Sequence, residues 1–174
     1  MVDRVTEVGV VLVDEIGVRE WSQLVNPQTR IPAFIERLTG ITNDMVVEAP
    51  RFEGIAQDLN LLLEGYLFIA HNARFDYGFL KNEFKRLNIV FRPNILCSVK
   101  LSRALFPEHK HHNLDSLIVR HDLKVSERHR ALGDAQLIHQ FWQTFIQTSM
   151  QPLLSPPSKN WWDVPVRLHK SMIV

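Results

Sequence analysis

A nearly unbroken run of β-branched residues, Val5 to Val13 (VTEVGVVLV), constrains the fold most strongly. Such a run predicts a strand that is buried on both faces, which requires a sheet with further layers packed on each side. A turn is favoured directly after it, at Asp14 to Gly17, and the alternating segment Glu20–Val25 predicts the second strand of a hairpin. The first part of the chain therefore predicts a β-hairpin at the centre of a layered domain.

The rest of the sequence alternates between short apolar runs and amphipathic segments. Two further strands are expected, at Tyr66–Ala70 and Ile95–Ser98. Helices are expected over Ile31–Leu38, after a cap at Thr42–Asp44, and over Phe52–Leu63, Arg74–Leu87, Val99–Phe106, Asn113–His121 and Ala131–Thr148. A hairpin followed by strands that alternate with helices indicates an α/β domain with a mixed sheet.

Composition limits the function classes. The chain has 174 residues and a formal net charge of +1, which suits one domain and argues against a protein that coats nucleic acid by charge alone. With one cysteine no internal disulfide can form, so a cytoplasmic location is expected, and no apolar run is long enough to span a membrane. Four of the nine prolines follow Gln151, so the domain is expected over 1–150 and a proline-rich tail over 151–174.

Two carboxylates lie on the apolar faces of predicted helices. Asp76 shares its face with Phe79, Leu80, Phe84 and Leu87, and Asp134 shares its face with Ile138, Phe141 and Phe145. One interpretation is a helix-terminus effect, because both acids fall in the first turn, where the helix dipole favours negative charge. The other is a shared metal site, for which carboxylates suit Mg²⁺ or Mn²⁺.

His129 precedes Asp134 by five residues, with Gly133 between them. This spacing predicts that His129 lies on the loop and Asp134 just inside the helix. An imidazole beside a metal-binding carboxylate is well placed to act as a general base. The alternative is a surface histidine within a polar stretch.

Together these residues resemble a known family. His71-Asn72-Ala73-Arg74-Phe75-Asp76 and His129-Arg130-Ala131-Leu132-Gly133-Asp134 are similar to the second and third motifs of the DnaQ-like 3′–5′ exonucleases of the DEDDh class. The resemblance covers roughly residues 3–147 in the family's order. It is nearest to the proofreading subunits of bacterial replicative polymerases, and it implies a ribonuclease-H-like mixed sheet flanked by helices.

The resemblance also implies a chemistry. Members hydrolyse phosphodiesters from a 3′ end with two divalent ions, Mg²⁺ or Mn²⁺. By resemblance, Asp134 and Asp76 would ligate metal, and His129 would take the proton from the attacking water. Asn72 and Phe75 would shape the substrate site, with Asn72 also a candidate helix cap and Phe75 a candidate core residue.

The family's first motif, D-x-E on its first strand, has no counterpart here. None of the 19 acidic residues has another acid two positions away. We therefore expect weak metal binding and low nuclease activity. We also expect the family's first strand to be missing from the middle of the sheet, with unpaired backbone groups on both of its neighbours.

Several partners and alternatives stay open. The expected substrate is a single-stranded or frayed DNA 3′ end, and an RNA-trimming relative of the same family is an alternative. Gln147–Met150 is similar to the segment with which polymerase proofreading subunits bind a sliding clamp. A catalytically inactive binding module for a polymerase subunit or a clamp is therefore the alternative from outside the enzyme class.

Overall fold

The computed structural model describes residues 4–150 and 170–173, with side chains described over 4–144. Its strands are β1 (Glu7–Asp14), β2 (Gly17–Leu24), β3 (Leu67–Ala70), β4 (Asn94–Cys97) and β5 (Lys170–Ile173). Its helices are α1 (Ala33–Thr39), α2 (Asn43–Val47), α3 (Phe52–Leu63), α4 (Arg74–Arg86), α5 (Ser98–Leu105), α6 (Leu114–His121) and α7 (Ala131–Met150).

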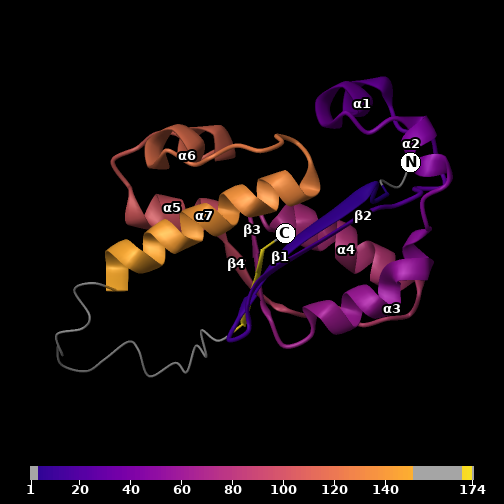
Figure 1. Cartoon of the computed structure of the whole chain (residues 1–174), viewed down its shortest axis with the longest axis horizontal. Helices are drawn as coiled ribbons and strands as arrows, with labels where there is room; N and C mark the ends of the chain where they lie inside the picture. The colour runs from indigo at the N-terminus through magenta and orange to yellow at the C-terminus, as the bar shows by residue number, and fades with distance from the viewer. Residues whose placement is uncertain (1–3, 151–169, 174) are drawn as a thin grey trace.

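The strands form one mixed sheet in the order β2-β1-β5-β3-β4. The hairpin of β1 and β2 is antiparallel, and β3 and β4 are parallel. Between these two pairs lies β5, antiparallel to β1 and parallel to β3. Figure 1 shows this last strand in yellow at the centre of the sheet, with α7 crossing the sheet.

Both faces of β1 are buried, as its β-branched sequence predicts. Val8, Val10 and Leu12 pack in one apolar cluster with residues of α3 and α4. Val11 points the other way and packs in a second cluster with residues of α6 and α7. The alternation of side chains along a strand thus gives a three-layer domain, with helices on each face of the sheet.

The C-terminal segment differs from the expectation. The sequence predicts a tail over 151–174 beyond the domain, but Lys170–Ile173 forms a strand inside the sheet. It pairs with β1 and β3, so the expectation of unpaired backbone groups on both neighbours is wrong for the stretches that β5 covers. The signal is weak in sequence because four residues carry little periodicity of their own.

Most helix predictions agree with the structure within two residues. Phe52–Leu63 is helical over the predicted range, and the hydroxyl of Thr42 caps α2 by accepting the N–H of Met45. The last helix runs on to Met150, so Gln147–Met150 is helical rather than a segment after the helix; its side chains lie outside the described residues. None of the described helices is both long and apolar enough to cross a membrane.

Candidate active site

Asp76 lies in the first turn of α4, on the side of the helix that enters the core through Leu80 and Phe84. Burial, together with the negative charge of Asp134, raises the pKa of Asp76 to about 6. The two carboxylates therefore lie near enough to repel each other, although they come from helices that are far apart in the sequence. Both line one pocket.

Asp134 lies in the first turn of α7, above the buried side chains of Ile138 and Phe141. Its Oδ1 accepts a hydrogen bond from Nη1 of Arg128 at 2.6 Å and from the backbone N–H of His129 at 3.3 Å. The same guanidinium reaches Oδ1 of Asp115 through Nη2 at 2.7 Å. Arg128 thus bridges two carboxylates and neutralises charge where sequence reasoning expected a metal.

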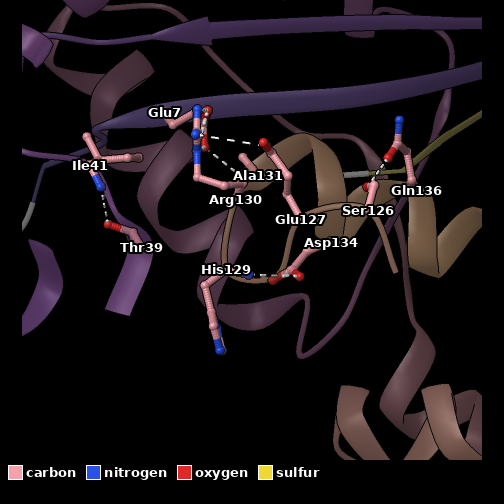
Figure 2. A network of polar contacts seen from close by, with 10 residues as sticks. All are labelled: Glu7, Thr39, Ile41, Ser126, Glu127, His129, Arg130, Ala131, Asp134 and Gln136. Carbon is pink, nitrogen blue, oxygen red and sulfur yellow. Dashed lines mark hydrogen bonds and ion pairs between the residues drawn. The ribbon is translucent and has the colours of Figure 1, made fainter. Parts of the chain in front are cut away.

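His129 lies in the turn before α7, as its spacing predicts, and its side chain is exposed. Its φ of 61° is in the left-handed region, which is costly for a residue with a side chain. The hydrogen bond from its backbone N–H to Asp134 helps to hold this conformation. Figure 2 shows the imidazole extending away from the carboxylate of Asp134. The backbone of His129 therefore belongs to the Asp134 cluster, while the ring is free to reach a ligand in the pocket that it lines.

Glu7 of β1 holds the start of α7. Its Oε2 accepts the backbone N–H of Ala131 at 2.8 Å, and its Oε1 accepts from Nη2 of Arg130 at 2.7 Å (Figure 2). The first N–H groups of a helix have no partner within the helix, so a carboxylate at this point caps α7 and complements its dipole. Sequence reasoning assigned Glu7 no such role, because its partners are more than 120 residues away.

Two glycines permit the close approach of these segments. A Cβ on Gly9 would lie 2.1 Å from the backbone nitrogen of Leu132, and one on Gly133 would lie 1.9 Å from the carbonyl oxygen of Glu127. Neither distance leaves room for a side chain. The strand, the loop and the helix start are therefore packed backbone against backbone, which fixes where Asp134 and His129 stand.

The structure corrects the expected minor roles of Asn72 and Phe75. Ala73 is the residue at the N-cap of α4, with no side-chain cap, and Asn72 precedes it in a left-handed conformation with φ of 62°. Phe75 is 62% exposed rather than a core residue, and its ring contacts that of Phe79 at 4.8 Å between centroids. Phe75 lines the pocket, whereas Asn72 is not among the lining residues.

The pocket that these groups share has a volume of about 760 Å³. Apolar side chains of α1 and α4 line one part of it, including Phe34, Leu38, Phe75 and Phe79. Both Phe34 and Phe75 are 62% exposed, so two aromatic rings are available to a ligand. The lining of the pocket also contains four arginines, Arg4, Arg30, Arg128 and Arg130. Aromatic rings combined with guanidinium groups suit the bases and phosphates of a single nucleic acid strand.

His71 is a further polar residue of this pocket. It follows β3, and its Nδ1 lies 3.0 Å from Oγ of Ser98, which in turn donates to the carbonyl of Ala70. Burial lowers the pKa of His71 to about 4, so the ring is neutral near pH 7. The sequence predicted that His71 follows a strand, but this position gave no reason to expect a half-buried, neutral imidazole.

The donor set does not fit two divalent ions. Mg²⁺ and Mn²⁺ take oxygen ligands, and a pair of ions needs several carboxylates to offset its charge. The described residues bring Asp76 and Asp134 together, and no group of three or more His, Cys, Asp or Glu side chains that could hold a metal ion occurs among them. The carboxylate of Asp134 also forms an ion pair with Arg128, which competes with a metal ion for its oxygen.

Sequence comparison finds relatives among nucleases. A sequence model of the exonuclease family RNase_T matches residues 1–141. The chain is 36% identical over 137 residues to the 3′-5′ exonuclease DinG of Bacillus subtilis, covering 78% of this chain and 15% of that protein. It is 34% identical over 135 residues to the PolC-type DNA polymerase III of Caldanaerobacter subterraneus, covering 77% of this chain and 10% of that protein. The chain thus spans a small part of these relatives' lengths.

Solved structures share the fold. Exonuclease X in complex with 5′ overhanging duplex DNA superposes with a TM-score of 0.68 and 25% identity, over 83% of each chain. A 3′-exonuclease that recognises the histone mRNA stem-loop superposes with a TM-score of 0.70 and 20% identity, over 82% of this chain and 72% of that one. These likenesses confirm the ribonuclease-H-like α/β fold expected from the motifs.

Proposed function

The chain belongs to the RNase_T exonuclease family, and from this premise we propose that its pocket receives the 3′ end of a nucleic acid strand for 3′–5′ exonucleolytic hydrolysis. Single-stranded or frayed DNA is the proposed substrate. The observation that carries the proposal is the convergence of Asp76, Asp134 and His129 on one pocket that also presents aromatic rings and arginines. Proofreading or repair is the corresponding biological role.

The binding part of the proposal rests on the pocket lining. Phe75 and Phe34 offer exposed rings on which the terminal bases can stack, and the exposed Arg30 offers positive charge to the phosphates. Stacking on an aromatic ring contributes about 1–3 kcal/mol per base and tolerates any base. We therefore expect tight binding of a strand end with little dependence on sequence.

The hydrolytic part assigns roles to three residues. His129 would take a proton from the attacking water, for which its exposed position in the turn before α7 is suitable. Asp76 and Asp134 are the proposed ligands of Mg²⁺ or Mn²⁺. Because two carboxylates do not fit a pair of ions, we expect weak metal binding and slow hydrolysis by this set of residues.

One contact favours a second function. Arg128 occupies Oδ1 of Asp134 at 2.6 Å, which places a cation of the chain itself against the carboxylate that the chemistry needs. A pocket in this state suits binding without hydrolysis. A non-catalytic module that holds strand ends for a polymerase or a sliding clamp is therefore the alternative, with the helical segment Gln147–Met150 as the proposed clamp contact.

A binding assay tests end recognition. The affinity of the protein for a linear 30-nucleotide single strand is compared with its affinity for a circular single strand of equal sequence, by competition in EDTA. We expect the linear strand to bind at least tenfold more tightly, and Phe75→Ala to weaken its binding roughly 5- to 100-fold. Val119→Ala, at an exposed site outside the pocket lining, is the matched control. Equal affinity for the two strands would contradict end recognition.

A cleavage assay separates the two functions. The strand carries a 3′ label, and Mn²⁺ is varied up to millimolar levels. Slow release of the terminal nucleotide that His129→Ala abolishes and His109→Ala leaves unchanged supports the exonuclease. Tight end binding without release at any metal concentration supports the non-catalytic module. Repeating both assays with an RNA strand of the same sequence shows whether the site prefers ribose or deoxyribose.

A further inference from the structure

The exposed side of α4 carries a row of basic side chains, Arg74, Lys81 and Lys85, called here the basic row. All three are exposed, and offsets of 7 and 11 residues from the first place them on one side of the helix. This side is turned away from Leu80 and Phe84, which are buried in the core. The basic row therefore faces solvent along most of the length of α4.

The charge of the basic row is not neutralised by the chain. None of its three cations is paired with an acid in the part of the chain whose side chains the structure describes. The acids of α4 are Asp76, which lines the pocket, and Glu83, which is 2% exposed and forms ion pairs with two other arginines. Lys81 lies 5.5 Å from the ring centroid of Tyr77, a contact that keeps its charge. Because the formal net charge is only +1, this positive charge is a local feature.

The energetics of a helix oppose this arrangement of charge. Arg74 is the first residue of α4, where the helix dipole disfavours a positive charge. Lys81 and Lys85 are four residues apart, and like charges at this spacing repel each other. The basic row therefore does not stabilise α4, which favours a role in binding an anionic partner.

The basic row begins beside the pocket and leads away from it. Arg74 directly precedes Phe75, whose exposed ring lines the pocket, whereas Lys85 lies near the other end of α4. Arg74 and Lys85 are 11 residues apart, which is about 16 Å along the axis at about 1.5 Å per residue. At about 3.4 Å per phosphate of a stacked strand, this length corresponds to about five nucleotides. A strand whose end stacks on Phe75 can thus place its next phosphates along the row.

We propose that the basic row of α4 binds the phosphate backbone of the strand whose 3′ end lies in the pocket. Arg74 contacts the phosphates nearest the pocket, and Lys81 and Lys85 contact those further from the 3′ end. Contacts of this kind fix the path of a strand without reading its bases. The proposal rests on the proposed function, because the pocket defines where the strand begins. It adds a second part to binding, whose strength depends on strand length and on salt.

Strand length separates the basic row from the pocket. Arg74→Gln, Lys81→Gln and Lys85→Gln are combined in one triple variant of the full chain. Its affinity for a 5′-labelled 12-nucleotide single strand and for a trinucleotide is measured by anisotropy in EDTA. We expect it to bind the longer strand roughly tenfold or more weakly than the wild type, and the trinucleotide within about twofold. For the longer strand, the slope of log K against log salt should become less steep by about 2, since each phosphate contact contributes about 0.7.

A matched control removes the same charge elsewhere. Arg103→Gln, Lys110→Gln and Lys124→Gln change exposed residues on α5 and on the segments before and after α6, and Figure 1 shows α5 and α6 apart from α4. We expect this control to bind both strands within about twofold of the wild type, because charges beyond about 10 Å are screened by salt. Thermal unfolding shows whether both variants are folded. The triple variant of α4 should be at least as stable as the wild type, because it removes the repulsion within the row.

Uncharged linkages locate the contacts on the strand. Methylphosphonates replace either the second to sixth linkages from the 3′ end of the 12-nucleotide strand, or the five linkages nearest its 5′ end. We expect the first set to weaken binding by the wild type roughly tenfold or more and to have little effect on the triple variant. The second set should have little effect on either protein, because the row is only about five nucleotides long.

Three results would overturn the role of the basic row. They are equal affinities of the wild type and the triple variant for the 12-nucleotide strand, equal losses from the two sets of uncharged linkages, and equally strong competition by a ten-residue aspartate peptide. The last result would mean that the row binds anions in general. Failure of the wild type to bind the trinucleotide, or to prefer linear over circular strands, contradicts the proposed function instead.

Discussion

The carboxylate of Glu7 on β1 accepts the backbone N–H of Ala131 at 2.8 Å, across 124 residues of sequence. This bond and the ion pair with Arg130 fix the first turn of α7 to the central strand. Asp134 and His129 flank this fixed point on either side. The position of both candidate catalytic groups thus depends on a residue that need not touch substrate.

Glu7→Gln should therefore destabilise the domain. The substitution keeps the size of the side chain but removes the charge, in a position where the Glu7 side chain is 8% exposed. We expect a loss of about 2–3 kcal/mol in the free energy of unfolding, measured by urea denaturation. Glu53→Gln, which affects an exposed ion pair of 3.9 Å with Arg51, should change it by less than about 0.5 kcal/mol. Equal effects of the two variants would contradict the role of Glu7.

Two glycines should respond in opposite directions to the same substitution. Gly133→Ala places a methyl group against the carbonyl of Glu127 and should cost about 2–3 kcal/mol of stability. Gly78→Ala, within α4 where a Cβ meets nothing within 4 Å, should stabilise by about 0.5–1 kcal/mol. Thermal unfolding of both variants checks this contrast, and a stable Gly133→Ala protein would mean that the loop before α7 is not packed as described.

Asp76→Asn should stabilise the metal-free protein at alkaline pH. Burial raises the pKa of Asp76 to about 6, above the ordinary value of 3.8, so its charged form opposes folding at pH 8. The folded state takes up the proton as the pH falls through 6, and the penalty disappears near pH 4. We expect a gain of up to about 3 kcal/mol at pH 8 and none at pH 4, measured in EDTA. Asp58→Asn, on the exposed side of α3, is the control.

Asp14→Asn should destabilise the protein with the opposite pH dependence. The hydrogen bond from Tyr66, with those from Ile16 and Arg19, holds the pKa of Asp14 at about 2, below its ordinary 3.8. Its contribution to stability is therefore complete above about pH 4 and is lost as the pH falls toward 2. Unfolding of the wild type and the variant from pH 2 to 5 should give curves that differ above pH 4 and converge near pH 2.

Arg128→Gln should expose Asp134 to cations. Removing the guanidinium frees Oδ1 of Asp134 and leaves the pocket more negative. We expect Mn²⁺ to bind about 3- to 10-fold more tightly, a gain of up to about 1.4 kcal/mol in binding free energy. Single-stranded DNA should bind more weakly in EDTA, because the pocket has lost a positive charge. Arg103→Gln, an equal change of charge on the exposed side of α5, should alter neither affinity. Unchanged Mn²⁺ binding in Arg128→Gln would show that the ion pair does not occupy the metal position.

Local sequence predicted the parts of the fold that local rules govern. The periodicity of Phe52–Leu63 and the cap at Thr42 gave helices that the structure contains, and the offsets around Asp76 placed it on the apolar side of its helix. The bridge from Arg128 to Asp115 and the cap from Glu7 to Ala131 were not predictable, because each joins segments whose proximity depends on the whole fold. The core alternative for Phe75 was wrong, because an aromatic residue beside core positions does not reveal that it faces a pocket, whereas its place at a substrate site stays a prediction.

The central position of β5 has a consequence for how the chain becomes a domain. Ribosomes release the hairpin of β1 and β2 more than 140 residues before residues 170–173, yet these later residues join the two halves of the sheet. The halves can be joined in this way only once residues 170–173 have been synthesised, and pairing over such a separation is slow. During synthesis, the inner edges of β1 and β3 remain open to any extended segment that reaches them first.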